Sequence, residues 1–268
     1  MTSRPGNRVR LDQLIVERGL AESRARAQAL LLAGRIRAGA GAGARVDRRP
    51  GDLVAPDLPL AVKQTPAWVS RGGEKLAAAL DRFLADDPGV DPAGRVCLDV
   101  GASTGGFTDV LLRRGARRVY ALDVGRGQLA ESLRTDPRVV SLERTNARQL
   151  APDAAAPVRL PEPVTFATVD VSFISLEKVL GPLAATFAPG GGRIVALVKP
   201  QFEAGREQVR RGVVRDPAVH RAVLERIRRH AAGLGLGVRG ETPSPLVGPA
   251  GNREFFLDLE VPPREGGT

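Results

Sequence analysis

The sequence predicts an α/β fold with a doubly wound, parallel β-sheet, and three observations lead to this class. Short apolar runs of strand length alternate with amphipathic stretches of helix length from residue 73 onward. A glycine-rich turn at residues 101–106 follows the first apolar run. An acidic residue, Asp123, ends the second run, about twenty residues after the turn begins. Together these features indicate a pocket for a nucleotide-type ligand at the carboxyl edge of the sheet.

The first forty residues predict a small helical unit before the sheet begins. Residues 8–40 read as two helices and a turn, with Leu11 and Leu14 in the first apolar stripe. Ser23 is expected to cap the second helix and Gly34 to end it. Residues 65–70 form a joint that holds the only tryptophan, Trp68, which we expect at a domain interface. The predicted division is a domain over 1–64, a linker over 65–71 and a larger domain over 72–268.

The larger domain is expected to begin with a helix at residues 73–84, one face of which is apolar. The predicted strands lie near residues 96–100, 118–122, 139–143, 166–170, 192–198, 236–242 and 254–260, separated by helices near 107–113, 128–134, 175–187 and 217–232. Such alternation implies a parallel sheet covered by helices on both faces. Asp216 and Pro217 open the last helix, and its two histidines, His220 and His230, are predicted to lie on the surface.

Composition narrows the class of protein. No run approaches the roughly 20 apolar residues that a membrane helix needs, and the polar N-terminus does not resemble a signal peptide. Cys97, the single cysteine, lies in a predicted strand and is expected to be a buried thiol, so neither a disulfide scaffold nor a metal site is predicted. We therefore expect a cytoplasmic protein that spans no membrane and has no obligate protein partner.

The charge is basic and unevenly distributed. The net charge is +10, and residues 1–65 carry 12 Lys and Arg against 6 Asp and Glu, which is +6 of that excess. This favours a polyanionic partner, although a solvated basic surface fits the same numbers. The 40 basic residues include four lysines, at positions 63, 75, 178 and 199. Where arginine predominates, a lysine is more often required for chemistry, because lysine can lose its proton when buried.

The glycine turn distinguishes between cofactors. The dinucleotide-binding fingerprint has a glycine at the position of Ser103, so a dinucleotide cofactor is less well supported. The pattern D-x-G-x-x-x-G-G from Asp99 to Gly106 instead resembles the first motif of Rossmann-like class I S-adenosylmethionine-dependent methyltransferases. The resemblance implies that S-adenosylmethionine binds here, with Asp123 holding its ribose and Asn146 near its adenine. The cofactor-binding residues that it implies are Asp99, Gly101, Ser103, Thr104, Gly105, Gly106, Phe107, Asp123, Asn146 and Ala147.

The basic N-terminal segment also resembles a known module. This segment is similar in sequence to the αL RNA-binding domain of a small-subunit ribosomal protein (ribosomal protein S-four) and of pseudouridine synthases. The similarity lies around Arg10, Gly19, Ser23, Ala27 and Gly34. That domain docks on RNA through basic residues of its helices, which contact mainly phosphates. The residues expected to contact RNA are Arg10, Arg24, Arg26 and Arg35, together with Arg71 after the joint.

Four charged residues are predicted to meet at the carboxyl edge of the sheet. Asp170 ends the fourth predicted strand, Lys199 ends the fifth, Glu254 begins the last, and Lys75 lies on the helix before the first. They resemble the Lys-Asp-Lys-Glu tetrad of ribose 2′-O-methyltransferases. Their surroundings and the N-terminal module resemble one family, the TlyA-type rRNA (cytidine-2′-O)-methyltransferases, which are also known as haemolysins.

The resemblance implies transfer of a methyl group to a cytidine ribose in rRNA within a ribosomal subunit. Longer members of the family carry a further C-terminal helix and act on both subunits, whereas shorter members act on the large one. This chain stops soon after its last predicted strand, so we expect 23S rRNA in the 50S subunit. Methylation of 16S rRNA is the wider possibility.

The chemistry needs a group that removes a proton from a weakly nucleophilic hydroxyl or stabilises its oxyanion. A lysine beside a second cation can act as a base. Lys199 is the predicted base, held by Asp170, while Lys75 steadies the alkoxide or a phosphate and Glu254 orients the lysines. Three alternatives are a non-catalytic RNA-binding factor, a membrane-active haemolysin, and a methyltransferase for bases or small molecules.

Overall fold

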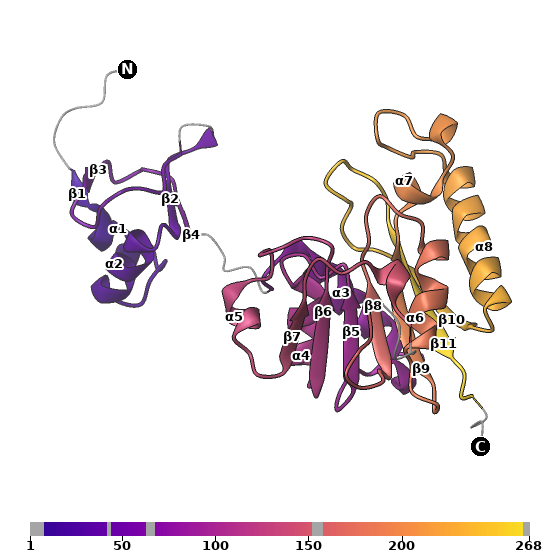
Figure 1. Cartoon of the computed structure of the whole chain (residues 1–268). Coiled ribbons are helices and arrows are strands. Elements are labelled where there is room, and N and C mark those ends of the chain that lie inside the picture. The colour runs from indigo at the N-terminus through magenta and orange to yellow at the C-terminus, as the bar shows by residue number, and fades with distance from the viewer. Residues whose placement is uncertain (1–7, 42–43, 63–67, 152–157, 265–268) are drawn as a thin grey trace. The chain divides into compact units, whose positions relative to one another are not determined.

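The computed structural model describes residues 8–41, 44–62, 68–151 and 158–264, and the chain divides into two compact units between residues 66 and 67 (Figure 1). Each unit has its own apolar core. The tip at residues 38–44, which the sequence marks by alternating alanine and glycine, and the joint at 65–70 lie partly outside the described residues.

The N-terminal unit packs two helices against two short antiparallel strand pairs. Its elements are β1 (Val9–Arg10), α1 (Leu11–Glu17), α2 (Arg24–Leu32), β2 (Ile36–Ala38), β3 (Leu53–Val54) and β4 (Leu60–Val62), with β1 paired to β3 and β2 to β4. Both predicted helices are present. Ser23 caps α2 by accepting a hydrogen bond from the Arg26 amide, and Gly34 follows the helix at φ +62°. The four strands were not predicted, because two- and three-residue strands show no alternation.

A buried carboxylate joins the two N-terminal helices. Asp12 of α1 is fully buried and accepts hydrogen bonds from Arg10, from Arg24 and from Gln28. The Arg10 guanidinium holds the pKa of Asp12 well below its usual range. These bonds orient Arg10 and Arg24 toward Asp12, so part of their hydrogen-bonding capacity is used inside the unit.

The C-terminal unit alternates helices and strands as predicted. Its longer helices are α3 (Arg71–Leu84), α4 (Gly106–Arg113), α5 (Glu131–Arg134), α6 (Leu180–Ala185), α7 (Pro200–Glu203) and α8 (Pro217–Gly233). Its strands are β5 (Val96–Val100), β6 (Arg118–Leu122), β7 (Val139–Leu142), β8 (Phe166–Val169), β9 (Gly192–Val198), β10 (Gly237–Pro243) and β11 (Phe255–Val261). Short 3-10 turns lie at Pro88–Val90, Ala147–Gln149, Leu176–Lys178 and Arg206–Gln208.

The seven strands form one sheet in the order β10-β11-β9-β8-β5-β6-β7. The five strands from β9 to β7 are parallel neighbours, whereas β11 runs antiparallel to both β9 and β10. The expectation of an all-parallel sheet is therefore wrong at this edge. The cause is the connection from β10 to β11, which returns the chain as an inserted antiparallel strand rather than through a crossover helix.

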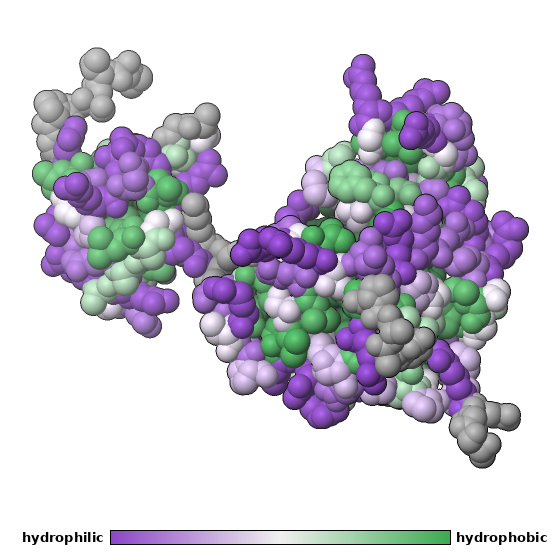
Figure 2. Space-filling view, in the orientation of Figure 1, coloured by the Kyte–Doolittle hydropathy of each residue, from purple (hydrophilic) through white to green (hydrophobic). Residues whose placement is uncertain are grey.

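Helices cover both faces of the sheet, as the sequence predicts (Figure 1). Alternate residues of one strand point into different cores: Leu98 packs in the cluster with α6 and α8, while Cys97 packs in the cluster with α3 and α4. Cys97 is free and fully buried, so the prediction of a buried thiol is confirmed, and burial raises the pKa of this thiol to about 12. The outward side of α8 is mainly hydrophilic in Figure 2.

Several local predictions need correction. The helix expected at 128–134 is confined to Glu131–Arg134, and that at 175–187 is broken into a 3-10 turn and α6. His220 is buried against Phe255, with Nε2 3.1 Å from the Val214 carbonyl oxygen, and is not a surface residue. Trp68 is partly buried against the core of the C-terminal unit, with the Arg113 guanidinium 4.8 Å from its ring centre, and its position at a domain interface stays a prediction.

Candidate active site

Two adjoining cavities open at the carboxyl ends of the parallel strands. The first, of about 720 Å³, is lined by the glycine turn and by all four predicted tetrad residues. The second, of about 460 Å³, is lined by the turn, by Asp123 and by the segment after β7. Gly101, Ser103, Asp170, Ser172 and Phe173 line both. The location agrees with the rule that ligands of doubly wound sheets bind beyond the carboxyl ends of the strands.

The glycine turn between β5 and α4 passes close to the backbone of the segment that follows β8. Gly101 has φ +84°, and a Cβ there would lie 2.4 Å from the Asp170 carbonyl oxygen. Gly105 caps α4 at φ +94°, where a Cβ would meet Leu133 at 2.2 Å. Gly101, Ser103, Thr104, Gly106 and Phe107 line the first cavity. Gly105 lines neither cavity and instead shapes the start of the helix.

Asp99 also differs from the expectation that it lines the cofactor pocket. Its side chain is fully buried beneath the turn, where it accepts hydrogen bonds from Thr108 Oγ1 (2.7 Å) and Thr168 Oγ1 (3.0 Å). It thereby fastens β5 to α4 and β8. Burial raises the pKa of Asp99 from 3.8 to about 7.

The raised pKa of Asp99 predicts a measurable pH effect on stability. Between about pH 4 and 7 the unfolded chain ionises this group while the folded chain keeps its proton, so stability falls as pH rises through that window. Asp99→Asn removes the effect. We subtract the free energy of unfolding of the variant from that of wild type. This difference is expected to fall by a few kcal/mol between about pH 4 and 7 and to stay constant above pH 7. Urea denaturation of both proteins at several pH values measures this, and a constant difference would contradict the assignment.

The second cavity contains the residues expected around the ribose and adenine. The Asp123 carboxylate accepts one hydrogen bond at each oxygen. The Ser103 amide donates to Oδ2 (2.8 Å) and the Gly125 amide donates to Oδ1 (2.7 Å). Each oxygen retains a second lone pair for a ligand hydroxyl. Asn146 and Ala147 line the same cavity beside Leu122 of β6. These positions fit a nucleoside that enters edge-on beside the turn.

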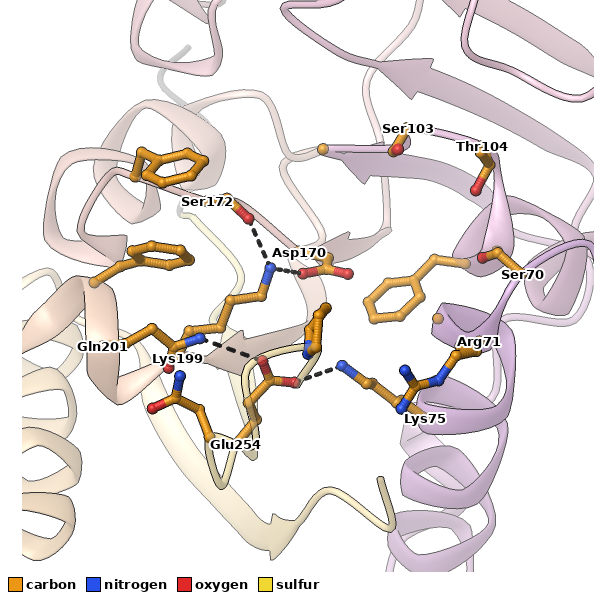
Figure 3. Close-up of a pocket in the computed structure, with 18 of the residues that line it drawn as sticks. Ser70, Arg71, Lys75, Ser103, Thr104, Asp170, Ser172, Lys199, Gln201 and Glu254 are labelled. Carbon is orange, nitrogen blue, oxygen red and sulfur yellow. Dashed lines mark hydrogen bonds and ion pairs between the residues drawn. The ribbon is translucent and has the colours of Figure 1, made fainter. Parts of the chain in front are cut away.

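The four tetrad residues meet as two ion pairs (Figure 3). Lys75 of α3 lies 2.5 Å from Glu254, and Lys199 lies 2.5 Å from Asp170 and 3.0 Å from Ser172 Oγ. Their side chains are largely buried, from 1% exposed for Glu254 to 23% for Asp170. Two lysines and two carboxylates thus face one cavity.

The antiparallel direction of β11 explains why Glu254 joins this group. Phe255 pairs with Val198, so the start of β11 lies beside the end of β9 and places Glu254 at the edge where Lys199 emerges. In a parallel strand the same residue would lie at the opposite edge of the sheet. Gln201, from α7, donates a hydrogen bond to Glu254 Oε1 at 3.5 Å (Figure 3).

The predicted RNA contacts fall on both units. Arg71 lines the first cavity and donates to the Val247 carbonyl oxygen at 3.1 Å. In the N-terminal unit Arg10, Arg24 and Arg26 are exposed, and Arg35 is half-buried. Arg10 and Arg24 are bonded to Asp12, as described above, which holds them in fixed positions.

Sequence reasoning missed several cavity residues. Ser172 and Gln201 contact the ion pairs directly, and Phe173 stands 90% exposed at φ +63°, its ring 4.8 Å from that of Phe202. These residues follow strand ends in loops, where no periodic pattern marks them. Their one available signal was proximity in sequence to Asp170 and Lys199.

The described residues contain neither a candidate metal site nor a helix that could span a membrane. No group of three or more His, Cys, Asp or Glu side chains there is arranged to hold a metal ion. No helix of that part of the chain is long and apolar enough to cross a membrane.

Comparison with known proteins places this geometry among methyltransferases. The FtsJ-like methyltransferase family matches residues 68–260. The chain is 47% identical to the 16S/23S rRNA (cytidine-2′-O)-methyltransferase TlyA of Mycobacterium tuberculosis, over 95% of this chain and 90% of that protein. It is 33% identical to the 23S rRNA (cytidine-2′-O)-methyltransferase TlyA of Campylobacter jejuni, over 78% of each. A solved structure named as a putative hemolysin from Streptococcus thermophilus superposes with a TM-score of 0.69 at 42% identity, covering 96% of this chain and 90% of that one.

Proposed function

The chain belongs to the FtsJ-like methyltransferase family, and from this premise we propose that it methylates a cytidine ribose 2′-hydroxyl in 23S rRNA. One observation carries the proposal: two lysine–carboxylate pairs face a cavity that shares its wall with the cofactor cavity. The two rRNA (cytidine-2′-O)-methyltransferases that the chain resembles are both named for 23S rRNA, and one of them is named for 16S rRNA as well. An enzyme with this substrate would work in the cytoplasm.

S-adenosylmethionine is the cofactor of this class of enzyme. The residues present fit it, because Gly101 lines both cavities without a side chain and each Asp123 carboxylate oxygen keeps a lone pair for a ligand hydroxyl. We assign its methionine part to Gly101, Ser103, Thr104 and Gly106, and its nucleoside to Asp123, Asn146 and Ala147. When bound, it supplies an electrophilic methyl group.

The chain's own residues would prepare the acceptor hydroxyl. Lys199 Nζ contacts Asp170 and Ser172, which line both cavities. Once the amine has released its own proton to solvent, it would accept the proton of a 2′-hydroxyl. The Asp170 carboxylate stabilises the protonated amine that this transfer produces. Lys75, held by Glu254, contributes positive charge that stabilises the developing oxyanion or a neighbouring phosphate.

Arginines of both units would bind the RNA. We propose that the N-terminal unit acts as an αL-type RNA-binding domain, with Arg10, Arg24, Arg26 and Arg35 on phosphates, and that Arg71 guides the target strand into the first cavity. Such contacts position the substrate and do not read its sequence.

The test is transfer of labelled methyl from S-adenosylmethionine to 50S subunits, 30S subunits and free rRNA purified from cells that lack the enzyme. Label on 23S rRNA alone supports the proposal. Label on 16S rRNA as well would widen the substrate. No label on any RNA, with the cofactor bound, would replace the proposal by a non-catalytic RNA-binding role.

The exposed Phe173 ring offers a face on which an unpaired base can stack at the mouth of both cavities. We expect Phe173→Ala to lower kcat/KM for RNA about 10- to 100-fold, since base–aromatic stacking contributes about 1–3 kcal/mol. Phe173→Tyr keeps the ring and should retain most activity. Equal activity of the alanine and tyrosine variants would contradict the stacking role.

A further inference from the structure

The two loops that carry Lys199 and Asp170 are joined by a buried carboxylate that belongs to neither ion pair. Glu203 closes α7, four residues after Lys199, and its side chain is 2% exposed. It reaches across to the loop that follows β8, the loop that carries Asp170, Ser172 and Phe173.

Glu203 makes a separate bond with each carboxylate oxygen. Oε1 accepts the Leu176 amide at 2.8 Å, and Oε2 accepts the Ser175 hydroxyl at 2.7 Å. Arg226 of α8 donates to the Glu203 carbonyl oxygen at 2.6 Å and to Oε2 at 3.2 Å. Three segments that are distant in sequence therefore meet at one side chain.

Burial of the Glu203 carboxylate is unfavourable for its charged form and raises its pKa, so its hydrogen bonds must offset this desolvation. Resting on the proposed function, we propose that Glu203 is a positioning residue, which holds the Lys199 loop and the Asp170 loop at the separation that the Lys199–Asp170 pair requires.

The geometry accounts for why one side chain has this influence. Lys199 lies on one loop, and both of its partners, Asp170 and Ser172, lie on the other. The rings of Phe173 and Phe202 also bring the two loops into contact, but Phe173 is mostly exposed. Removing the Glu203 carboxylate leaves the amide of Leu176 and the hydroxyl of Ser175 without their acceptor, which weakens the connection between the loops. A displacement near 1 Å at a catalytic group can cost on the order of 100-fold in rate.

The kinetic test compares Glu203→Ala, Glu203→Gln and the matched control Glu177→Ala. Glu177 also pairs with Arg226, at 3.2 Å, but bonds to neither catalytic loop through its side chain in the described contacts. We expect Glu203→Ala to lower kcat about 10- to 100-fold with an S-adenosylmethionine Kd within threefold of wild type. Glu203→Gln should restore most of the rate, and Glu177→Ala should keep it within twofold.

A double-mutant cycle separates positioning from general instability. In a Lys199→Ala background, Glu203→Ala should have little further effect on kcat, because the pair that it positions is already gone. An undiminished effect there, or a loss of cofactor affinity in parallel with rate, would overturn the proposal.

A second readout does not depend on activity. Brief labelling with acetic anhydride, followed by mass spectrometry, reports how exposed each lysine amine is. We expect Lys199 to be labelled several-fold faster in Glu203→Ala than in wild type, while Lys75, whose partner Glu254 lies elsewhere, is unchanged. An unchanged Lys199 rate would overturn the inference. Wild type that transfers no methyl, with the Lys199 rate still raised in the variant, would reject the proposed function and leave the positioning role standing.

Discussion

Lys199→Ala is expected to lower the rate of methyl transfer about 10²- to 10⁴-fold while leaving cofactor binding nearly intact. The amine contacts Asp170 and Ser172, which line both cavities, and loss of a general base costs about 10²- to 10⁴-fold in rate. The nucleoside cavity is lined by the end of β6 and the segment after β7, and its lining does not include Lys199. The measurement pairs labelled methyl transfer with calorimetric titration of S-adenosylmethionine.

The matched control is Lys178→Ala. Lys178 is exposed and lies in a neighbouring 3-10 turn, outside both cavities. Its variant should transfer methyl at the wild-type rate. If Lys199→Ala keeps its rate within a few-fold of wild type, the base is a different group, and Lys75 becomes the next residue to test.

Gly101→Ala is expected to abolish cofactor binding and to destabilise the C-terminal unit. The added Cβ would lie 2.4 Å from the Asp170 carbonyl oxygen and 2.9 Å from its carbonyl carbon, so the turn or the β8 loop must move. Both border the cofactor cavity. A positive φ adds about 1–2 kcal/mol of strain for alanine. Titration of S-adenosylmethionine and thermal unfolding measure the two effects.

Gly94→Ala separates strain from collision. Gly94 has φ +71°, close to that of Gly101, but a Cβ there meets nothing within 4 Å. The Gly94 variant should lose roughly 1–2 kcal/mol of stability and bind the cofactor normally. If both variants bind S-adenosylmethionine like wild type, the close approach at Gly101 has no role in the cofactor site.

Local sequence predicted the elements well where a pattern was long enough to read. Strands β5, β6 and β9 begin and end at the predicted residues, because each is a bounded apolar run. The direction of β11 was missed, since strand direction depends on partners elsewhere in the chain. His220 was missed although a signal existed: it precedes Val223 and Ile227 at helical spacing, on the apolar face of α8.

The candidate site was predictable in part. The strand-end rule located Asp170 and Lys199, and resemblance to a tetrad added Lys75 and Glu254. The sequence did not distinguish a residue that lines a pocket from one that supports it, and Asp99 shows this: its side chain turns toward two threonines beneath the turn. Glu203 was not singled out either, because a charged residue outside a periodic apolar pattern is usually solvated.

The position of β11 also governs the order in which a newly made chain becomes active. As the chain leaves the ribosome, β9 appears first and β10 next, yet β11, made last, inserts between them. Until it does, the edge of β9 has no partner, and Lys75 has no carboxylate from residue 254 beside it. An exposed sheet edge invites pairing with other chains. A nascent chain thus lacks one member of the proposed tetrad until β11 is in place, and truncation within residues 244–261 should yield aggregation instead of partial activity.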